Sequence, residues 1–335
     1  MAQRSLSRCL AIRARATNLA PYGVGTTLLA AGTTLLIALA PATVAYWFII
    51  SRKRIARLAR QSPLGGDLLR PPGHSLRAQL EELQFDLASD LAILLFIPAL
   101  PMAYLYLTAR MGGQPNTLLV EACLAVGAIA FVVFHVRSML VKAERVDRLK
   151  LGLDAELAVG QELIGLVRQG AAVFHDVDAG DFNIDHVVVA QQGIFAVETK
   201  GYTKPAAMRG PAKARVTYDG AQLVMPTWSS TEPIAQAERQ AQWLGKWLSS
   251  ATGDRISVTP VVALPGWFVD RKGRGVVHVL NHRELERLLN IRTARPLTPA
   301  ELQRSTHQLD QRCRNMRPLY RPDGPSGVSA ADIGR

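Results

Sequence analysis

The hydrophobic positions of this chain form two patterns: long apolar runs before residue 140, and short apolar runs separated by polar residues after residue 150. The first long run, residues 26–50, carries no charge, and as a helix it can cross ~30 Å of hydrocarbon at ~1.5 Å per residue. Two further runs follow at 91–107 and 117–136. The pattern predicts about three transmembrane helices within residues 26–140, after a basic N-terminal segment at 1–25.

Polar and helix-breaking residues occur in the second and third runs. Pro98 and Pro101 would kink the second run, which membranes tolerate when neighbouring groups satisfy the freed carbonyls. Glu121 lies near the start of the third run, where its carboxylate can reach the interface. The alternatives are a signal peptide for residues 26–50 and buried core helices for the other two runs. The first run is longer than the ~7–15 residues of a signal h-region, and the other two lack an amphipathic stripe.

The basic residues predict the orientation of these segments. The loop at 51–87 holds Arg52, Lys53, Arg54, Arg57, Arg60, Arg70 and Arg77, and the segment after residue 136 is also basic, whereas the loop at 109–116 holds only Arg110. By the positive-inside rule both basic segments face the cytoplasm. We therefore expect a multi-pass protein of the inner (cytoplasmic) membrane with its second half in the cytoplasm. Three spans put the N-terminus outside despite its four arginines, unless the first segment is re-entrant or interfacial.

Short β-branched runs after residue 150 predict strands. The run Ile184–Ala190, the polar Gln191–Gly193 and the run Ile194–Val197 have the pattern of a β-hairpin. Later segments predict an amphipathic helix at 233–248, strands at 256–264 and 276–280, a helix from the cap Asn281 to 289, and a final helix at 296–314. This order predicts an α/β domain with a mixed sheet flanked by helices.

The domain boundaries follow from the same patterns. We expect the α/β domain at 150–292 and the C-terminal helical segment at 293–317. Residues 318–335 are rich in Pro, Gly, Ser and Asp and are expected to be disordered.

Two carboxylates and a lysine gather on the predicted hairpin. Asp185 begins the first strand, and Glu198 and Lys200 end the second; residues two apart share a strand face, so these two side chains point the same way. Burying either charge alone is expensive, whereas carboxylates around a divalent cation with an ammonium beside them form a self-consistent cluster. Asp185 and Glu198 would hold Mg²⁺, with Mn²⁺ as a substitute, and Lys200 would stabilise charge on a scissile phosphate. The cluster suits phosphodiester hydrolysis.

The spacing of Asp185 and Glu198-Thr199-Lys200 resembles the D-(D/E)-x-K signature of restriction-endonuclease-like nucleases. The surrounding stretch, IDHVVVAQQGIFAVETKGY, is similar to the nuclease-related domain (NERD) family. Three features around it agree with the family: the acidic helix GLDAELAVGQEL, a strand reaching Asp176, and Pro233-Ile234-Ala235-Gln236.

This resemblance covers roughly residues 150–290 and implies a restriction-endonuclease-like fold. It also implies a set of catalytic residues, namely Glu156, Asp185, Glu198 and Lys200, and a polar substrate contact from Gln236. Either Glu156 or Glu162 can be the acid on the helix, and Glu156 better fits the family's spacing to the aspartate strand.

The net charge of +12 suits an anionic partner, although part of it belongs to the clusters beside the apolar runs. Lys204, Arg209, Lys213 and Arg215 follow the hairpin, where a phosphate backbone could pass, and Lys204 is a candidate substrate contact. A solvated basic loop explains these residues equally well. Trp228, Trp243, Trp247 and Trp267 could stack on bases, but Trp243 and Trp247 have helical spacing that suits a core face.

The leading hypothesis is therefore a membrane-anchored, metal-dependent nuclease that hydrolyses DNA on the cytoplasmic side, with a homodimer allowed because many such nucleases cut both strands as dimers. The alternative is a catalytically inactive, membrane-tethered nucleic-acid-binding or protein-scaffold module. DNA and RNA, and endonuclease and exonuclease action, stay open at this stage.

Overall fold

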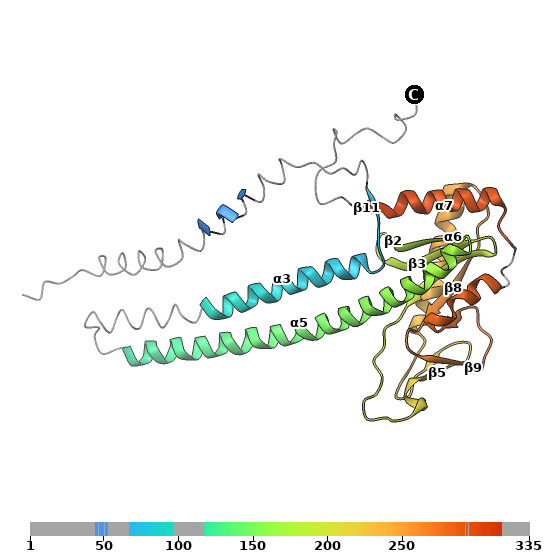
Figure 1. Cartoon of the computed structure of the whole chain (residues 1–335). Coiled ribbons are helices and arrows are strands. Elements are labelled where there is room, and N and C mark those ends of the chain that lie inside the picture. The colour runs from blue at the N-terminus through green and yellow to red at the C-terminus, as the bar shows by residue number, and fades with distance from the viewer. Residues whose placement is uncertain are drawn as a thin grey trace, which may run out of the picture. The chain divides into compact units, whose positions relative to one another are not determined.

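The computed structural model describes residues 44–45, 47–49, 51–52, 67–96, 117–291, 293 and 295–316 (Figure 1). The chain divides into two compact units, residues 1–61 with 94–133 and residues 62–93 with 134–335. The second unit contains the sheets and the residues of the predicted hairpin.

Helix α5 (Thr117–Arg168) runs without a break through the predicted third span and the predicted acidic helix. Within the described part of the chain, its stretch Ala125–Arg168 is the one helix long and apolar enough to cross a membrane, by length and composition. One such helix is weak support for the predicted membrane region. The predicted span at 26–50 and the 97–107 part of the second span lie almost wholly outside the described residues, and 91–96 ends helix α3 (His74–Phe96).

The central sheet has five strands in the order β10-β8-β4-β3-β2. Their bounds are β2 Ala172–Asp178, β3 Asn183–Ala190, β4 Gly193–Thr199, β8 Val258–Ala263 and β10 His278–Leu280. The β2–β3 and β3–β4 pairs are antiparallel, whereas β4–β8 and β8–β10 are parallel. The predicted hairpin is confirmed as β3 and β4, and the sheet is mixed as predicted.

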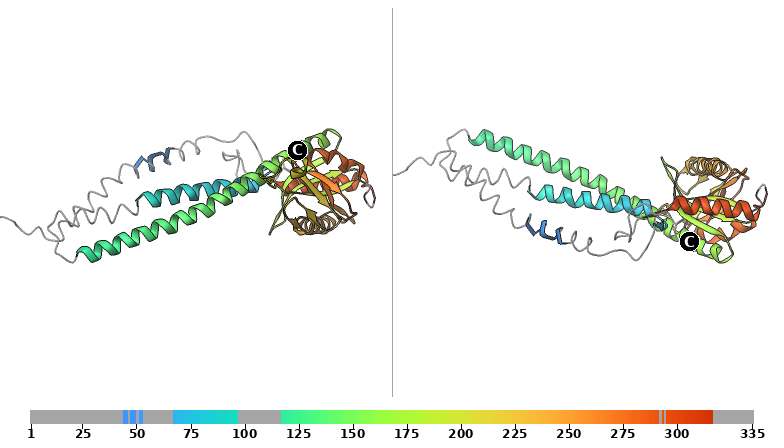
Figure 2. Two further views of the ribbon diagram at one scale, coloured as in Figure 1. Left: turned by 90° about the horizontal axis from the view of Figure 1, so that it is seen from below. Right: turned by 90° about the horizontal axis from the view of Figure 1, so that it is seen from above.

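Helices cover both faces of this sheet (Figures 1 and 2). On one face, Leu244 of α6 (Glu232–Thr252) and Leu309 of α7 (Pro299–Cys313) pack against strand residues such as Val187. On the other face, Leu163 of α5 and Leu285 of the 3₁₀ helix η2 (His282–Asn290) pack against residues such as Phe195. The β-branched run in β3 is buried on both sides because both faces are covered.

A second sheet of four short strands, in the order β7-β6-β5-β9, adjoins the first. Its strands are β5 Arg215–Tyr218, β6 Leu223–Val224, β7 Ser229–Ser230 and β9 Phe268–Arg271, and the 3₁₀ turn η1 (Pro211–Ala214) leads into β5. Val216 and Leu223 join a core with Val262 of the central sheet. The sequence did not predict this sheet, because strands of two to four residues are too short to show alternation.

A two-stranded pairing ties the beginning of the second unit to its end. Strand β1 (Leu68–Leu69) pairs antiparallel with β11 (Arg314–Met316), and the backbone N–H of Arg70 donates to the carbonyl of Cys313 at 3.1 Å. Residues just before α3 are therefore held beside the end of α7.

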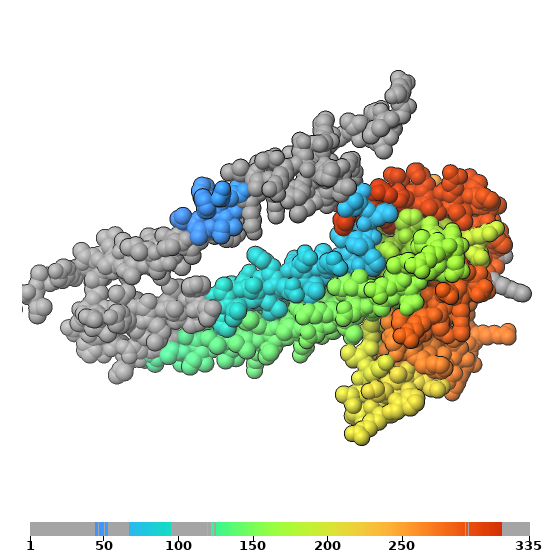
Figure 3. Space-filling model, viewed as in Figure 1, coloured from blue at the N-terminus to red at the C-terminus, as the bar shows by residue number. Residues whose placement is uncertain are grey.

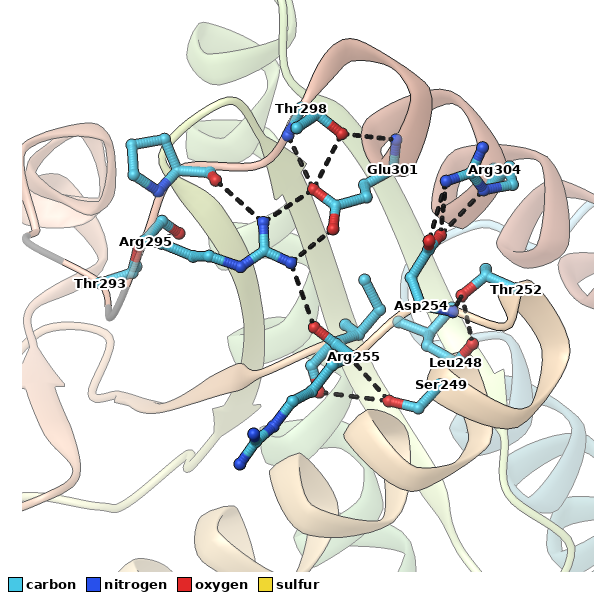
Figure 4. Close-up of polar contacts among 12 residues, drawn as sticks. Leu248, Ser249, Thr252, Asp254, Arg255, Thr293, Arg295, Thr298, Glu301 and Arg304 are labelled. Atoms are coloured by element: carbon cyan, nitrogen blue, oxygen red, sulfur yellow. Dashed lines mark hydrogen bonds and ion pairs between the residues drawn. The ribbon is translucent and has the colours of Figure 1, made fainter.

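The start of α7 is held by a polar network (Figure 4). Thr298 and Glu301 form a capping box in which the Thr298 N–H donates to Glu301 Oε2 at 2.8 Å. The Arg295 guanidinium donates to both oxygens of the Glu301 carboxylate and also to the carbonyl of Arg255 at 3.4 Å. Arg304 pairs with Asp254 at 2.8 Å, so the network joins α7 to the segment after α6. Asn281 likewise caps η2 as predicted, although that helix is 3₁₀.

Candidate active site

Asp185 and Glu198 lie beside each other on neighbouring strands. The register pairs His186 with Val197, and the next position along the hairpin sets Asp185 opposite Glu198. The backbone N–H of Thr199 donates to Asp185 Oδ2 at 2.6 Å. The hairpin thus brings together the two carboxylates that the sequence singled out.

Glu198 is almost completely buried and both of its oxygens accept hydrogen bonds. Its Oε1 lies 2.8 Å from the Nζ of Lys200, and its Oε2 accepts from Gln240 Nε2 at 2.6 Å. Burial raises the pKa of Glu198, and Lys200 and Gln240 oppose that rise. Burial alone would lower the pKa of Lys200, but the Glu198 carboxylate outweighs it and raises that pKa overall. Lys200 is therefore a fixed, protonated cation.

Helix α6 supplies two amides to this pair. Lys200 Nζ donates to Gln236 Oε1 at 2.8 Å, so the structure brings Gln236 into the cluster as the resemblance implied. Gln240 follows four residues later on the same helical face, is 1% exposed, and also approaches the carbonyl of Asn183 at 3.3 Å. The sequence analysis missed Gln240; its spacing of one helical turn from Gln236 was the signal that could have found it.

Glu156, on α5, is buried beside the hairpin carboxylates. Burial, and then the negative charges of Asp176 and Glu198, raise its pKa to about 7, while a backbone hydrogen bond from Gly73 opposes the rise. Glu162, the other helix acid, is exposed. The structure therefore brings Glu156, and not Glu162, into the electrostatic field of the cluster.

The pKa of Asp185 also rises, first because the side chain is buried and then because Glu198 and Glu156 repel its negative charge. The Thr199 N–H and the Lys200 ammonium lower it only in part. The three carboxylates thus share a site with too little positive charge to neutralise them.

Asp176 is a further buried carboxylate, to which the sequence analysis gave no role. Among the described residues it is the one non-glycine residue with a positive φ, 51°. This conformation is costly for a side chain with a Cβ, so surrounding contacts must stabilise it. Asp176 Oδ2 accepts from the N–H and the hydroxyl of Ser75 at 3.0 and 2.6 Å, Oδ1 accepts from Asn183 Nδ2 at 2.9 Å, and the carbonyl accepts from Arg70 at 3.0 Å.

A cavity of about 350 Å³ lies over these acids. Four carboxylates line it, those of Glu156, Asp176, Asp181 and Asp185, and the first turns of α3 close one side with Ser75 and Gln79. The cavity gives a ligand access to the acidic cluster from the side of α3.

Lys204 stands apart from this cluster. Its side chain is exposed, and its ammonium lies against the backbone of Gly266, where an added Cβ would be 3.7 Å away. Among the hydrogen bonds of the described residues, none joins Lys204 to a carboxylate of the site.

The donors of this site have the chemistry that a hard divalent cation requires. Carboxylate oxygens are the ligands that Mg²⁺ prefers, and a cation would relieve the repulsion that raises the pKa values of Glu156 and Asp185. Within the part of the chain that the structure describes, no group of three or more His, Cys, Asp or Glu side chains is arranged so that it could hold a metal ion. The residues fit a cation that keeps several waters and takes only one or two carboxylates.

Comparison with known proteins relates this segment to one family. Residues 151–265 match the model of the nuclease-related domain (NERD). The matched residues include every member of the cluster on β3, β4, α5 and α6. Neither the curated proteins nor the solved structures contain a match to this chain. The match indicates a nuclease-related function for the α/β domain.

Proposed function

We propose that this protein is a divalent-metal-dependent nuclease that hydrolyses phosphodiester bonds of DNA, anchored in the inner membrane with its nuclease domain in the cytoplasm. The observation that carries the proposal is the group of Asp185, buried Glu198 and Lys200: Lys200 pairs with Glu198, and the backbone N–H of Thr199, between them in sequence, donates to Asp185. The group lies inside a segment that matches a nuclease-related domain. The Lys200 Nζ lies 2.8 Å from the buried Glu198 carboxylate, where its positive charge could stabilise the negative charge of a phosphate.

Each residue of the cluster has a distinct task in this proposal. A Mg²⁺ or Mn²⁺ ion held by Asp185 and Glu198 would make a bound water easier to deprotonate and offset phosphate charge. Lys200, fixed by Glu198 and Gln236, donates a hydrogen bond to a phosphate oxygen. Glu156, with a pKa of about 7, can exchange a proton at neutral pH.

The membrane anchor in the proposal is supported by the apolar stretch of α5 and by the basic clusters that flank the apolar runs of the sequence. Two domains could act on opposite strands of a duplex if the protein is a homodimer.

The test is cleavage by the full chain purified in detergent. Supercoiled plasmid, linear DNA and RNA are incubated with Mg²⁺, Mn²⁺ or EDTA, using wild type, Asp185→Asn and Lys200→Ala. Cleavage that needs a metal and falls about 100-fold or more in both variants is expected. Glu162→Gln, an exposed acid of the same domain, is the matched control and keeps full activity. Equal traces of cleavage in all four proteins would overturn the proposal.

The second candidate is a catalytically inactive membrane-tethered module that binds nucleic acid or protein. The observation in its favour is that both oxygens of Glu198 and one of Asp185 already have protein donors, as in a satisfied structural network. Such a module would show no cleavage, and nucleic-acid binding, if present, would weaken with salt and ignore EDTA.

A further inference from the structure

The four-stranded sheet carries exposed aromatic side chains that the proposed cleavage chemistry does not use. Trp228 is 41% exposed and Phe268 is 60% exposed. Trp228 lies in the turn between β6 and β7. The backbone carbonyl of Trp228 accepts a hydrogen bond from the Met225 N–H at 2.8 Å. Because β6 runs antiparallel to β5 and β5 runs parallel to β9, this turn lies at the end of the sheet where Arg215 and Phe268 begin their strands.

Trp228 is held in place by Tyr202. The two rings stand edge to face with centroids 4.9 Å apart and an interplanar angle of 76°. Tyr202 is itself fixed, since its ring packs on the core of the small sheet and its carbonyl accepts from Trp267 Nε1 at 3.3 Å. The indole thus contacts a packed ring while much of its surface faces solvent.

This aromatic pair adjoins the cluster on the hairpin. Tyr202 is two residues beyond Lys200, so the same chain segment carries both. Burial raises the pKa of the Tyr202 hydroxyl and the positive charge of Lys200 opposes that rise, which places the hydroxyl within the field of the ammonium. A group stacked on the pair would lie beside the lysine proposed to hold the phosphate.

Cations accompany the rings at this end of the sheet. The Arg215 guanidinium lies over the Phe268 ring, 4.8 Å from its centroid, and Arg215 is half exposed. Lys204 projects into solvent beside Gly266, two residues before Phe268. In the space-filling view the yellow surface, about residues 200–225 on the colour bar, projects from the domain, open to solvent (Figure 3).

We propose that Tyr202–Trp228 and Phe268–Arg215 form a binding path for an unpaired strand of DNA that leads to Lys200, with a base stacked on Trp228. Exposed rings interleaved with cations are the chemistry by which proteins hold single strands, because every base has a π-face and every linkage a charge. A duplex keeps its bases stacked on each other and cannot offer a face to Trp228. The inference rests on the proposed nuclease function and narrows its substrate to single-stranded, flapped or frayed DNA.

The test measures binding without cleavage. A fluorescently labelled single-stranded oligodeoxynucleotide and the duplex of the same sequence are titrated with the full chain in detergent and EDTA, and anisotropy gives each Kd. Trp228→Leu keeps apolar bulk and removes the ring; it should weaken single-strand binding about 10-fold or more and leave duplex binding unchanged. Trp228→Phe, which keeps a ring, should lose less.

Two further variants keep the result interpretable. Val224→Ala changes a 40% exposed side chain on the neighbouring strand β6 and should leave every Kd unchanged. Phe268→Leu replaces the second exposed ring and should also weaken single-strand binding. The path can therefore still be tested if Trp228→Leu fails to fold. Unchanged single-strand affinity in both ring variants would overturn the path, as would equal losses for single strand and duplex.

The outcomes for the path and for the nuclease are separable. If wild type cleaves nothing with Mg²⁺ or Mn²⁺ but Trp228→Leu selectively loses single-strand binding, the path stands and the nuclease proposal fails. If wild type cleaves and the ring variants bind and cut single strands like wild type, the nuclease stands and the path fails. A parallel loss of single-stranded RNA binding supports the path, since RNA bases stack on the same ring.

Discussion

Glu156 is one of the carboxylates whose ionisation the fold opposes. Its folded pKa of about 7 lies above the ordinary 4.5 because of burial and of the neighbouring charges of Asp176 and Glu198. Below pH 4.5 the residue is neutral in the folded and the unfolded chain, so it costs nothing. As pH rises from 4.5 to 7, only the unfolded chain releases the proton, so the free energy of unfolding falls by up to about 3 kcal/mol.

We therefore predict that Glu156→Gln stabilises the metal-free protein at pH 8, by up to about 3 kcal/mol, and changes little at pH 4. Denaturant unfolding of the full chain in EDTA at the two pH values measures the difference. Glu162→Gln, at an exposed position, should match wild type at both. An equal effect of Glu156→Gln at pH 4 and pH 8 would show that packing, and not charge, governs this site.

The same variant separates stability from activity. If Glu156 exchanges a proton in the reaction, Glu156→Gln lowers kcat while the protein becomes more stable at pH 8. Cleavage rates across pH 6–9 in wild type and Glu156→Gln measure this. A variant that keeps the wild-type rate and pH profile would remove Glu156 from the chemistry.

At the scale of the elements, Asp176 joins strand β2 to the first turn of α3. Its carboxylate accepts from the N–H and the hydroxyl of Ser75. Ser75 lies at the N-terminus of α3, where unsatisfied backbone N–H groups favour negative charge. Asp176 makes these contacts from a backbone with a positive φ of 51°.

Ser75→Ala should accordingly cost about 1 kcal/mol of stability, because the hydroxyl that serves both Asp176 and Asn183 is lost. Hydrogen exchange should accelerate at the amides of the first turn of α3 and at no other helix start. Ser89→Ala, at a half-buried position farther along the same helix, is the control. Uniform acceleration over the whole domain would contradict a local link.

The start of α7 predicts an acid-dependent stability. Arg295 and the Thr298 N–H hold the pKa of Glu301 well below its usual value. A depressed pKa stabilises the fold at any pH above the ordinary glutamate pKa, and that stability is lost as pH falls through the lower, folded value. Glu301→Gln should lower the melting temperature at pH 7 and converge with wild type as the pH is reduced below 4, as thermal unfolding by circular dichroism will measure.

The sequence predicted the elements that depend on contacts between residues close in sequence, and did not predict those that depend on distant contacts. The β3–β4 hairpin, the α6 helix and the Asn281 cap depend on neighbours in sequence, and they were predicted correctly. The β5–β9 pairing joins residues about fifty apart and leaves no local pattern. Asp176 was named in the sequence as part of a strand but given no role for the same reason, since its partner Ser75 comes from a distant segment.

For the whole molecule, the proposed membrane anchor makes a direct prediction. The full chain should stay in the membrane pellet after washing with 1 M-scale salt and with alkaline carbonate, because burial of apolar helices resists both whereas charge attraction does not. Fractionation followed by immunoblotting measures it. Release by carbonate would contradict spanning helices and leave only peripheral attachment.

The cytoplasmic orientation is tested separately. Protease should cut the exposed basic loop around Lys204 and Arg209 in inside-out vesicles and spare it in intact spheroplasts. The opposite pattern would reverse the orientation that the basic segments predict.

The pairing of β1 with β11 has a consequence for the moment at which the site is completed during synthesis. Arg70, which bonds to the carbonyl of Asp176, also bonds to Asn315 across 245 positions of sequence, and β1 has no partner until residues 314–316 have left the ribosome. The apolar runs are translated and can enter the bilayer long before that point. We expect the cavity beside Asp176 to acquire its final shape only after residues 314–316 have been made, so a nascent chain that lacks them would not yet carry the proposed nuclease activity.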